Sequence, residues 1–283
     1  MESKRDLAIV LRVVAYEDRH RIVTALTEQN GLISAMARNS IQSRRFGGCL
    51  DQFAASEWLF VEKPGTELVR LDEAHIRRAF DGLRKDFERL SMASVFSEFM
   101  LKIAPKGEAC PDLFKLHSNA LATLEELPGT GASLPLLNAY LAKLLQWSGS
   151  QPQLLACLGC QRPLSEMNQQ NPLSCLIADA AWVCGDCRTV ETRHVRERQG
   201  EGFQALHLRV SPMAILDFQL SISTPIRQMP TQARASEPEH RELFKFIEAL
   251  VVYHLPGFDK TPLKSLRFLN LESTLPHPAA NPR

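Results

Sequence analysis

The chain has 283 residues, of which 45% are hydrophobic and 23% are charged, and its formal net charge is +1. This length predicts two or three domains, and the near-neutral charge argues against a protein that coats polyanions with its whole surface. No apolar run approaches the roughly 20 residues of a membrane helix, and the first residues lack an apolar core of signal-peptide length. We therefore expect a soluble, cytoplasmic protein with no membrane partner.

Short segments of β type fill the first 80 residues. Gln29-Asn30-Gly31 and Lys63-Pro64-Gly65 are turn sequences between runs that are rich in β-branched residues. The five predicted strands cover residues 6–15, 22–27, 32–37, 51–62 and 66–76. Five short strands without an early helical pattern predict a small closed barrel of the OB-fold type.

The spacing of apolar residues changes to a helical period from about Ala79. The predicted helices cover residues 79–103, 111–127, 134–147, 212–220 and 239–255, with a polar loop over 222–238. Ser211-Pro212 is a suitable cap and first turn for the fourth of them. Their Leu and Phe stripes indicate core packing rather than a cofactor site.

The strongest motif is a pair of Cys-x-x-Cys sequences, which contain Cys157 and Cys160, then Cys184 and Cys187. Two such pairs are typical of a four-thiolate site that holds one structural Zn²⁺ in a closed tetrahedron. Gly159 and Gly185 are expected to let the two turns curl around the metal. Four unrelated buried thiols and a redox dithiol are weaker alternatives, because a redox site needs only one pair.

Three cysteines remain outside this motif. Cys49, Cys110 and Cys175 are expected to be buried free thiols, and Cys175 is also a candidate substitute ligand because it lies inside the metal loop. Free thiols and a thiolate metal site suggest a reducing compartment.

Arginines cluster around the third predicted strand and the hairpin before it. The members of this group are Arg12, Arg19, Arg21, Arg38, Arg44 and Arg45. On a small five-stranded barrel they are candidates for contacts with a DNA backbone, although a solvated charged surface is the plainer interpretation of any single one. The aromatic residues Tyr16, Phe46, Phe53, Trp58 and Phe60 are individually more typical of a core than of a base-stacking platform.

A second basic group follows the last cysteine, with Arg188, Arg193, His194, Arg196 and Arg198 interleaved with acidic residues. The alternation favours a self-neutralised surface. The sequence contains no phosphate-binding Gly-rich loop, no nucleophile elbow and no His-Glu-x-x-His helix, so no residue is predicted to be catalytic.

The order of these parts resembles the bacterial RecO family of DNA repair and recombination mediators. The likeness rests on four stretches: residues 9–31, residues 37–53, the knuckle that follows Gly149-x-x-Pro152, and residues 262–269. The chain departs from the family pattern at Asn39-Ser40, where a glycine is usual, and at Ala178-Asp-Ala-Ala181, where glycines usually precede the second cysteine pair. Asn tolerates a left-handed backbone, so the first turn is expected to survive.

The resemblance implies an α+β multidomain protein, with an N-terminal OB-fold β-barrel and a helical domain that carries an inserted four-cysteine zinc knuckle. The expected ranges are 1–80 for the nucleic-acid-binding barrel, 81–150 for the helical domain, 151–205 for the knuckle, 206–270 for C-terminal helices that pack on the helical domain, and 271–283 for a disordered tail.

The function implied by the resemblance is that of a mediator rather than an enzyme. Such a protein binds single- and double-stranded DNA, anneals complementary strands and, with RecR, helps to load RecA onto DNA coated by the single-strand-binding protein SSB, whose C-terminal tail it recognises. A zinc-stabilised adaptor that binds only proteins is the main alternative, and a DNA-processing enzyme is a weaker one.

Overall fold

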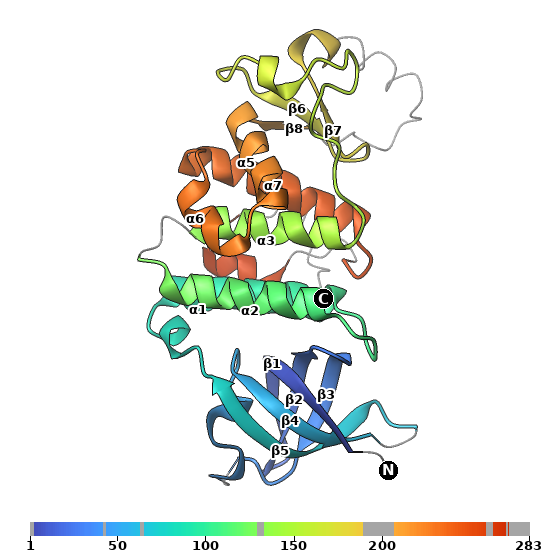
Figure 1. Ribbon diagram of the computed structural model, residues 1–283, viewed down its shortest axis with the longest axis vertical. Helices are drawn as coiled ribbons and strands as arrows, with labels where there is room; N and C mark the ends of the chain where they lie inside the picture. The colour runs from blue at the N-terminus through green and yellow to red at the C-terminus, as the bar shows by residue number, and fades with distance from the viewer. Residues whose placement is uncertain are drawn as a thin grey trace, which may run out of the picture. The chain divides into compact units, whose positions relative to one another are not determined.

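The computed structural model describes residues 3–41, 44–62, 65–128, 133–188, 207–258, 263–269 and 271, without the side chains of Arg44 and Arg45 (Figure 1). Two compact units divide the chain, residues 1–128 and residues 129–283. The predicted disordered tail is residues 271–283, of which Leu271 is described and buried, and residues 272–283 lie outside the described residues.

The first unit begins with a closed five-stranded barrel in the order β1-β2-β3-β5-β4. Its strands are β1 (Ser3–Tyr16), β2 (His20–Thr27), β3 (Gly31–Ala37), β4 (Ala55–Val61) and β5 (Leu68–Arg78). All neighbours are antiparallel except β3 and β5, which pair in parallel and close the barrel. The interior is filled by small and aromatic side chains such as Ala25, Ala35, Trp58 and Phe60. The predicted OB-type barrel is therefore confirmed.

A bulge in β1 decides which of its side chains face outward. Val10 pairs with Ala25 of β2, but the next pair joins Arg12 to Thr24, so Leu11 is an extra residue in the ladder. In a regular strand, residues two apart point to the same side, so Arg12 would point into the barrel like the buried Val10. The bulge instead pairs Arg12 with Thr24 on the outer face of the barrel, and Arg12 is exposed.

The segment between β3 and β4 differs from the prediction. The fourth strand was expected from residue 51, but it begins at Ala55, after the 3-10 helix η1 (Arg44–Leu50). Phe53 takes a left-handed backbone with φ 72° before the strand and is itself buried. This tight turn is not visible in the apolar pattern, which reads continuously into the strand.

A helical hairpin completes the first unit, with the short η2 (Asp81–Arg84) followed by α1 (Phe87–Ile103) and α2 (Pro111–Glu126). The Asp86 carboxylate caps α1, because its Oδ1 accepts a hydrogen bond of 2.7 Å from the backbone N–H of Glu88. The loop after α1 is tied to the β2–β3 turn by backbone hydrogen bonds, including Leu32 N to Pro105 O at 2.7 Å and Cys110 N to Glu28 O at 3.0 Å.

Gly31 makes this close approach possible. Its φ is +64°, and a Cβ atom there would lie 2.2 Å from Pro105 O and 2.6 Å from Glu108 O. We expect Gly31→Ala to lower the free energy of unfolding by about 3 kcal/mol, because left-handed strain adds to a clash with two backbone oxygens.

The matched control for that substitution is Gly107→Ala in the same loop. Gly107 also has a left-handed φ, +74°, but a Cβ there meets no atom within 4 Å. Gly107→Ala should lower the free energy of unfolding by only about 1 kcal/mol, because it adds backbone strain but no clash. Urea denaturation of both variants measures the difference, and equal losses would contradict the clash.

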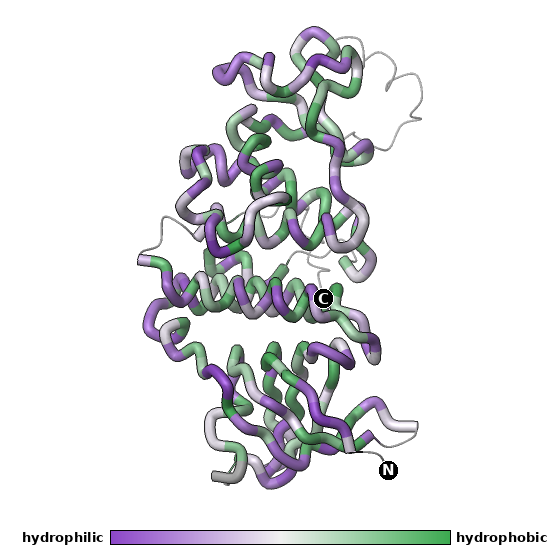
Figure 2. Tube along the Cα trace, in the orientation of Figure 1, coloured by the Kyte–Doolittle hydropathy of each residue, from purple (hydrophilic) through white to green (hydrophobic). Residues whose placement is uncertain are grey.

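In the second unit, α3 (Ser133–Trp147) is buried almost all round, although its colour in Figure 2 includes hydrophilic as well as hydrophobic positions. A helix that is buried on nearly every side needs neighbours on each of them. Here these are α5 (Pro212–Ser223), the short α6 (Met229–Gln232) and α7 (Glu237–His254). The predicted cap of α5 is confirmed, since Ser211 Oγ accepts a 3.1 Å hydrogen bond from Ala214 N.

The polar stretch 222–238, predicted as a loop, contains α6 and the short η5 (Ile226–Gln228). Its organisation depends on Asp217, which is buried and accepts backbone hydrogen bonds from Arg234 and Ala235. The last predicted helix is present as α7, and its predicted inward residues Leu243, Phe246, Ile247 and Leu250 are all buried. Near the end, η6 (Lys264–Leu269) was not predicted.

A small sheet lies in the segment that contains the two cysteine pairs, and Cys184 directly follows one of its strands. The strands β6 (Leu173–Leu176), β7 (Ala181–Val183) and β8 (His207–Val210) form an antiparallel sheet in the order β7-β6-β8. We call residues 151–188 together with β8 the cysteine knuckle. Several of its loops are hydrophilic in Figure 2. The five predicted domain ranges stay a prediction, since the contact-based division only groups α1 and α2 with the barrel and α3 with the knuckle.

Candidate nucleic-acid interface and metal centre

The outer face of β1, β2 and β3 presents three rows of side chains across neighbouring strands. Antiparallel partners point to the same face of a sheet, so the register gives the rows directly. They are Arg12, Thr24 and Ser34, then Val14, Ile22 and Met36, then Tyr16 and His20. The Thr24 and Ser34 hydroxyls lie 3.1 Å apart, within hydrogen-bond distance. The face therefore combines a polar row, a half-exposed apolar row and an aromatic row.

Two of the predicted arginines, Arg19 and Arg38, lie at one end of this face. Arg19 lies in the β1–β2 turn, and its carbonyl accepts a 3.2 Å hydrogen bond from Ile41 N. Arg21 differs, because it pairs with Ala37 of the barrel core and therefore belongs to an inward-facing row, where it is half-buried. The chain leaves β3 through Asn39, whose backbone has φ 52° and whose N–H donates to His20 Nδ1 at 2.9 Å. The left-handed turn expected at this asparagine is confirmed.

The remaining predicted arginines are Arg12, Arg44 and Arg45. Arg12 is on the same outer face, and the Val14 row separates it from Arg19 and Arg38. The backbones of Arg44 and Arg45 begin η1, and their side chains lie outside the described residues. Whether the six arginines act as one DNA-binding set stays a prediction.

Charge pairing distinguishes this face from the neighbouring strand β5. On β5, Arg70 lies 2.7 Å from Asp72, and Arg77 lies 2.8 Å from Glu57. Within the part of the chain that the structure describes, Arg12, Arg21 and Arg38 have no ion pair with a carboxylate. Their charges are therefore available to a ligand.

Of the five aromatic residues that the sequence assigned to the core, four are buried and Tyr16 is exposed. Phe46, Phe53, Trp58 and Phe60 are buried in the first unit, so their interpretation as core is confirmed. Tyr16 is 43% exposed at the end of β1. Sequence reasoning missed its row partner His20 and the exposed Val14, because the bulge that turns Val14 outward leaves no mark in the apolar pattern.

The four motif cysteines converge in the knuckle. The Sγ atoms of Cys157, Cys160, Cys184 and Cys187 all lie within 4.8 Å of one another. The Sγ atoms of Cys160 and Cys184 are 3.8 Å apart, which is far beyond the roughly 2.05 Å of a disulfide. Bonds of about 2.3 Å to a tetrahedral zinc would separate two sulfurs by about 3.8 Å. The arrangement fits a metal ion.

Backbone donors and neighbouring thiols support this interpretation. Cys184 N donates to Cys157 Sγ at 3.3 Å. Burial raises the pKa of Cys157, but backbone N–H groups around its sulfur outweigh burial and lower that pKa to about 7. The neighbouring thiols of Cys184 and Cys160 raise the pKa of Cys187 to about 12. Four thiolates therefore need a cation between them.

The glycines act differently from the expectation. Neither Gly159 nor Gly185 has a positive φ. A Cβ at Gly159 would lie 3.0 Å from Cys187 Sγ, so this glycine leaves room for the opposite cysteine. Gly185 has open space around it. Ala180, in the stretch where the family pattern has glycines, adopts φ 48° instead.

The other cysteines are buried, as predicted. Burial raises the pKa of Cys110 to about 11 and raises that of Cys175 further, so both thiols are protonated at neutral pH. Cys175 is not part of the four-sulfur cluster. In the second basic group, Arg188 is described, and Arg193, His194, Arg196 and Arg198 lie outside the described residues.

Comparisons with known proteins agree along the chain. Residues 1–80 match the family model for the N-terminal part of recombination protein O, and residues 84–212 match the model for its C-terminal part. A DNA repair protein RecO of Anaeromyxobacter dehalogenans is 31% identical over 188 residues, which are 66% of this chain and 71% of the relative. The protein of the same name from Rhodopirellula baltica is 28% identical over 261 residues, 92% of this chain and 93% of the relative.

A third relative of that name, from Pelobacter propionicus, is 32% identical over 188 residues, 66% of this chain and 73% of the relative. Among the described residues, no helix has the length and apolarity that a membrane crossing requires.

Proposed function

Because the chain belongs to the RecO family of DNA repair proteins, we propose that it is a recombination mediator that binds DNA strands on the outer face of its barrel. The observation that supports this proposal is the contrast in charge pairing between the arginines of β1–β3 and those of β5. Phosphate contacts from unpaired arginines supply affinity without sequence preference.

The three rows suggest how a strand would lie. Arg12 at one end of the face, and Arg19 and Arg38 at the other, would contact the backbone, together with Arg44 and Arg45 of the following segment. Tyr16 and the apolar row between them would support the bases by stacking and van der Waals contact. A strand held by its backbone keeps its base-pairing edges free, so a complementary strand can anneal to it.

The cysteine cluster would hold one structural Zn²⁺ per chain. Four thiolates leave no open position for a substrate, so the metal would stabilise the knuckle and take no part in a reaction. We propose that the protein acts by binding rather than as an enzyme, and that its partners are single- and double-stranded DNA, RecR and the C-terminal tail of SSB during the loading of RecA.

A strand-annealing assay tests this function. Two complementary oligonucleotides, one with a fluorophore and one with a quencher, are mixed at low salt with and without the protein. The protein is expected to raise the annealing rate, and rising salt should abolish the effect because phosphate contacts release counterions. A protein-only adaptor would leave annealing at its spontaneous rate, and a nuclease would shorten the strands when Mg²⁺ is added.

A further inference from the structure

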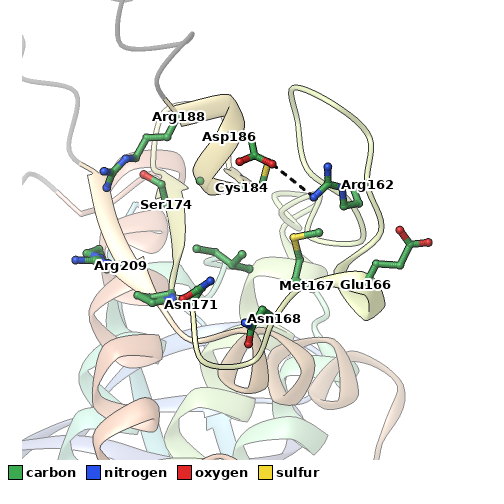
Figure 3. Close-up of a pocket in the computed structure, with 13 residues that line it drawn as sticks. Arg162, Glu166, Met167, Asn168, Asn171, Ser174, Cys184, Asp186, Arg188 and Arg209 are labelled. Carbon is green, nitrogen blue, oxygen red and sulfur yellow. Dashed lines mark ion pairs between the residues drawn. The ribbon is translucent and has the colours of Figure 1, made fainter.

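A pocket of about 400 Å³ opens on the cysteine knuckle of the second unit, beside the metal cluster. It lies between the turn after η4 (Leu164–Glu166), the strands β6 and β8, and the turn that begins at Cys184. Three arginines line it, Arg162, Arg188 and Arg209, and all three are exposed. Figure 3 shows Arg162 on one side and Arg188 and Arg209 on the other.

The pocket is rich in hydrogen-bond donors. Asn168, Asn171 and Ser174 lie between the arginines. Asn168 Oδ1 already accepts a 2.9 Å hydrogen bond from Gln170 N, so its NH₂ group is the end that can donate to a ligand. Guanidinium groups and amides are the groups that bind phosphate oxygens. The described lining includes no aromatic ring on which a base could stack, and its apolar part consists of Met167, Pro172 and Leu173.

Negative charges of the protein itself lie near the three arginines. Two carboxylates, Glu166 and Asp186, also line the pocket, and one Zn²⁺ with four thiolates would add two negative charges beside it. The Arg162–Asp186 ion pair is long at 3.6 Å, and the Asp186 side chain is 81% exposed. Exposed pairs of this kind contribute little stability, so Arg162 can exchange the carboxylate for a phosphate oxygen. A phosphodiester group has one negative charge, so these neighbouring charges repel it less than they would repel a triphosphate.

The arginines are held by the same elements that hold the metal ligands. Arg162 comes two residues after Cys160, and Arg188 directly follows Cys187. Arg188 N donates to Cys184 O at 3.0 Å. Arg209 pairs with the buried Ser174 across β6 and β8. The spacing of the guanidinium groups therefore depends on the folded, metal-bound knuckle.

We propose that this pocket binds one phosphodiester group of a nucleic-acid strand through Arg162, Arg188 and Arg209. This second contact rests on the proposed function, because it assumes that the protein binds DNA, but it uses a different unit of the chain from the barrel face.

The test is fluorescence anisotropy with a labelled single-stranded oligonucleotide and the full-length, zinc-loaded protein. The pocket variant is Arg162→Gln with Arg209→Gln. The control, Arg234→Gln with Arg241→Gln, removes the same charge from the same unit outside the pocket, at the exposed Arg234 and the half-buried Arg241. We expect the pocket variant to bind about tenfold more weakly. Its plot of log affinity against log salt should be shallower by about 0.7, the value for one lost phosphate contact on a single strand. The control should match the wild type.

Several outcomes would overturn the proposal. If the pocket variant binds the oligonucleotide with wild-type affinity, the pocket makes no contact with the strand. A barrel variant measured in parallel shows whether the outer face of the barrel binds the strand, so a failure of this proposal is distinguished from a failure of the proposed function. Loss of bound zinc from the pocket variant would mean that the arginines only balance the charge of the thiolates. Inorganic phosphate at millimolar concentration that binds the wild type without displacing the oligonucleotide, and fails to bind the pocket variant, would assign the site to the free anion. An acidic peptide that binds the wild type without displacing the oligonucleotide, and fails to bind the pocket variant, would assign it to a protein partner.

Discussion

Cys157→Ser is expected to lower the free energy of unfolding of the second unit by on the order of 5 kcal/mol, because the loss of one thiolate removes most of the metal affinity from folding. Cys157 is fully buried, and its sulfur accepts the N–H of Cys184 from the other cysteine pair. The serine oxygen cannot replace a thiolate in a four-sulfur site. Calorimetry and metal analysis of the purified variant measure the two effects, and a chelator should destabilise the wild type in the same way.

The matched control is Cys175→Ser. Cys175 is buried in β6 of the same knuckle but does not belong to the cluster. Cys175→Ser should lower the free energy of unfolding by about 1 to 2 kcal/mol, because the buried serine hydroxyl is imperfectly hydrogen-bonded. The variant should still bind one zinc per chain. If Cys157→Ser melts like the wild type, or if both variants lose the metal equally, the structural site is not the one described.

Arg12→Glu with Arg38→Glu is expected to weaken binding of single-stranded DNA by on the order of 100-fold at about 50 mM salt, and to reduce the salt slope by about 1.4, for two lost phosphate contacts. These two arginines lie toward opposite ends of the outer face, and both are exposed. Reversing their charges would remove two attractions and add two repulsions along the proposed path of the strand.

The control is the same pair of changes on β5, Arg70→Glu with Arg77→Glu. It shifts the net charge by the same amount, but these arginines are already paired with Asp72 and Glu57. Anisotropy titrations at several salt concentrations should show a small uniform loss for the β5 variant. Equal losses would mean that net charge alone governs binding, and that the outer face of β1–β3 has no special part.

The sequence predicted the type of each major element because the relevant signals are local. The turn at Asn30-Gly31, the cap at Ser211 and the two Cys-x-x-Cys pairs each depend on a few consecutive residues, and each lies in the predicted setting. The order of strands in the barrel was not predicted, because the parallel pairing of β3 with β5 joins segments that are distant in the sequence.

What could not be predicted depends on tertiary structure. The bulge between Val10 and Arg12 changes which face Arg12, Val14 and Tyr16 occupy, and only the register with β2 shows it. The three strands of the knuckle are four residues or fewer, too short for a periodic signal. The fold of residues 222–238 depends on the buried Asp217, a partner outside that segment.

The sequence also could not show which arginines form ion pairs with carboxylates. Arg12 and Arg77 are both arginines of barrel strands, yet of the two only Arg77 has a carboxylate partner, on the neighbouring strand β4. Charge patterning along the chain cannot distinguish them, because their neighbours are set by strand order.

The central claim is that a DNA strand lies on the outer face of β1, β2 and β3. Photo-cross-linking tests it most directly: an oligonucleotide with photoreactive bases is bound to the full-length protein, and the adducts are mapped by peptide mass spectrometry. The account predicts adducts within residues 12–38, with Tyr16 as the main site because it is the exposed aromatic residue on that face. Adducts elsewhere in the chain with none in those residues would contradict it.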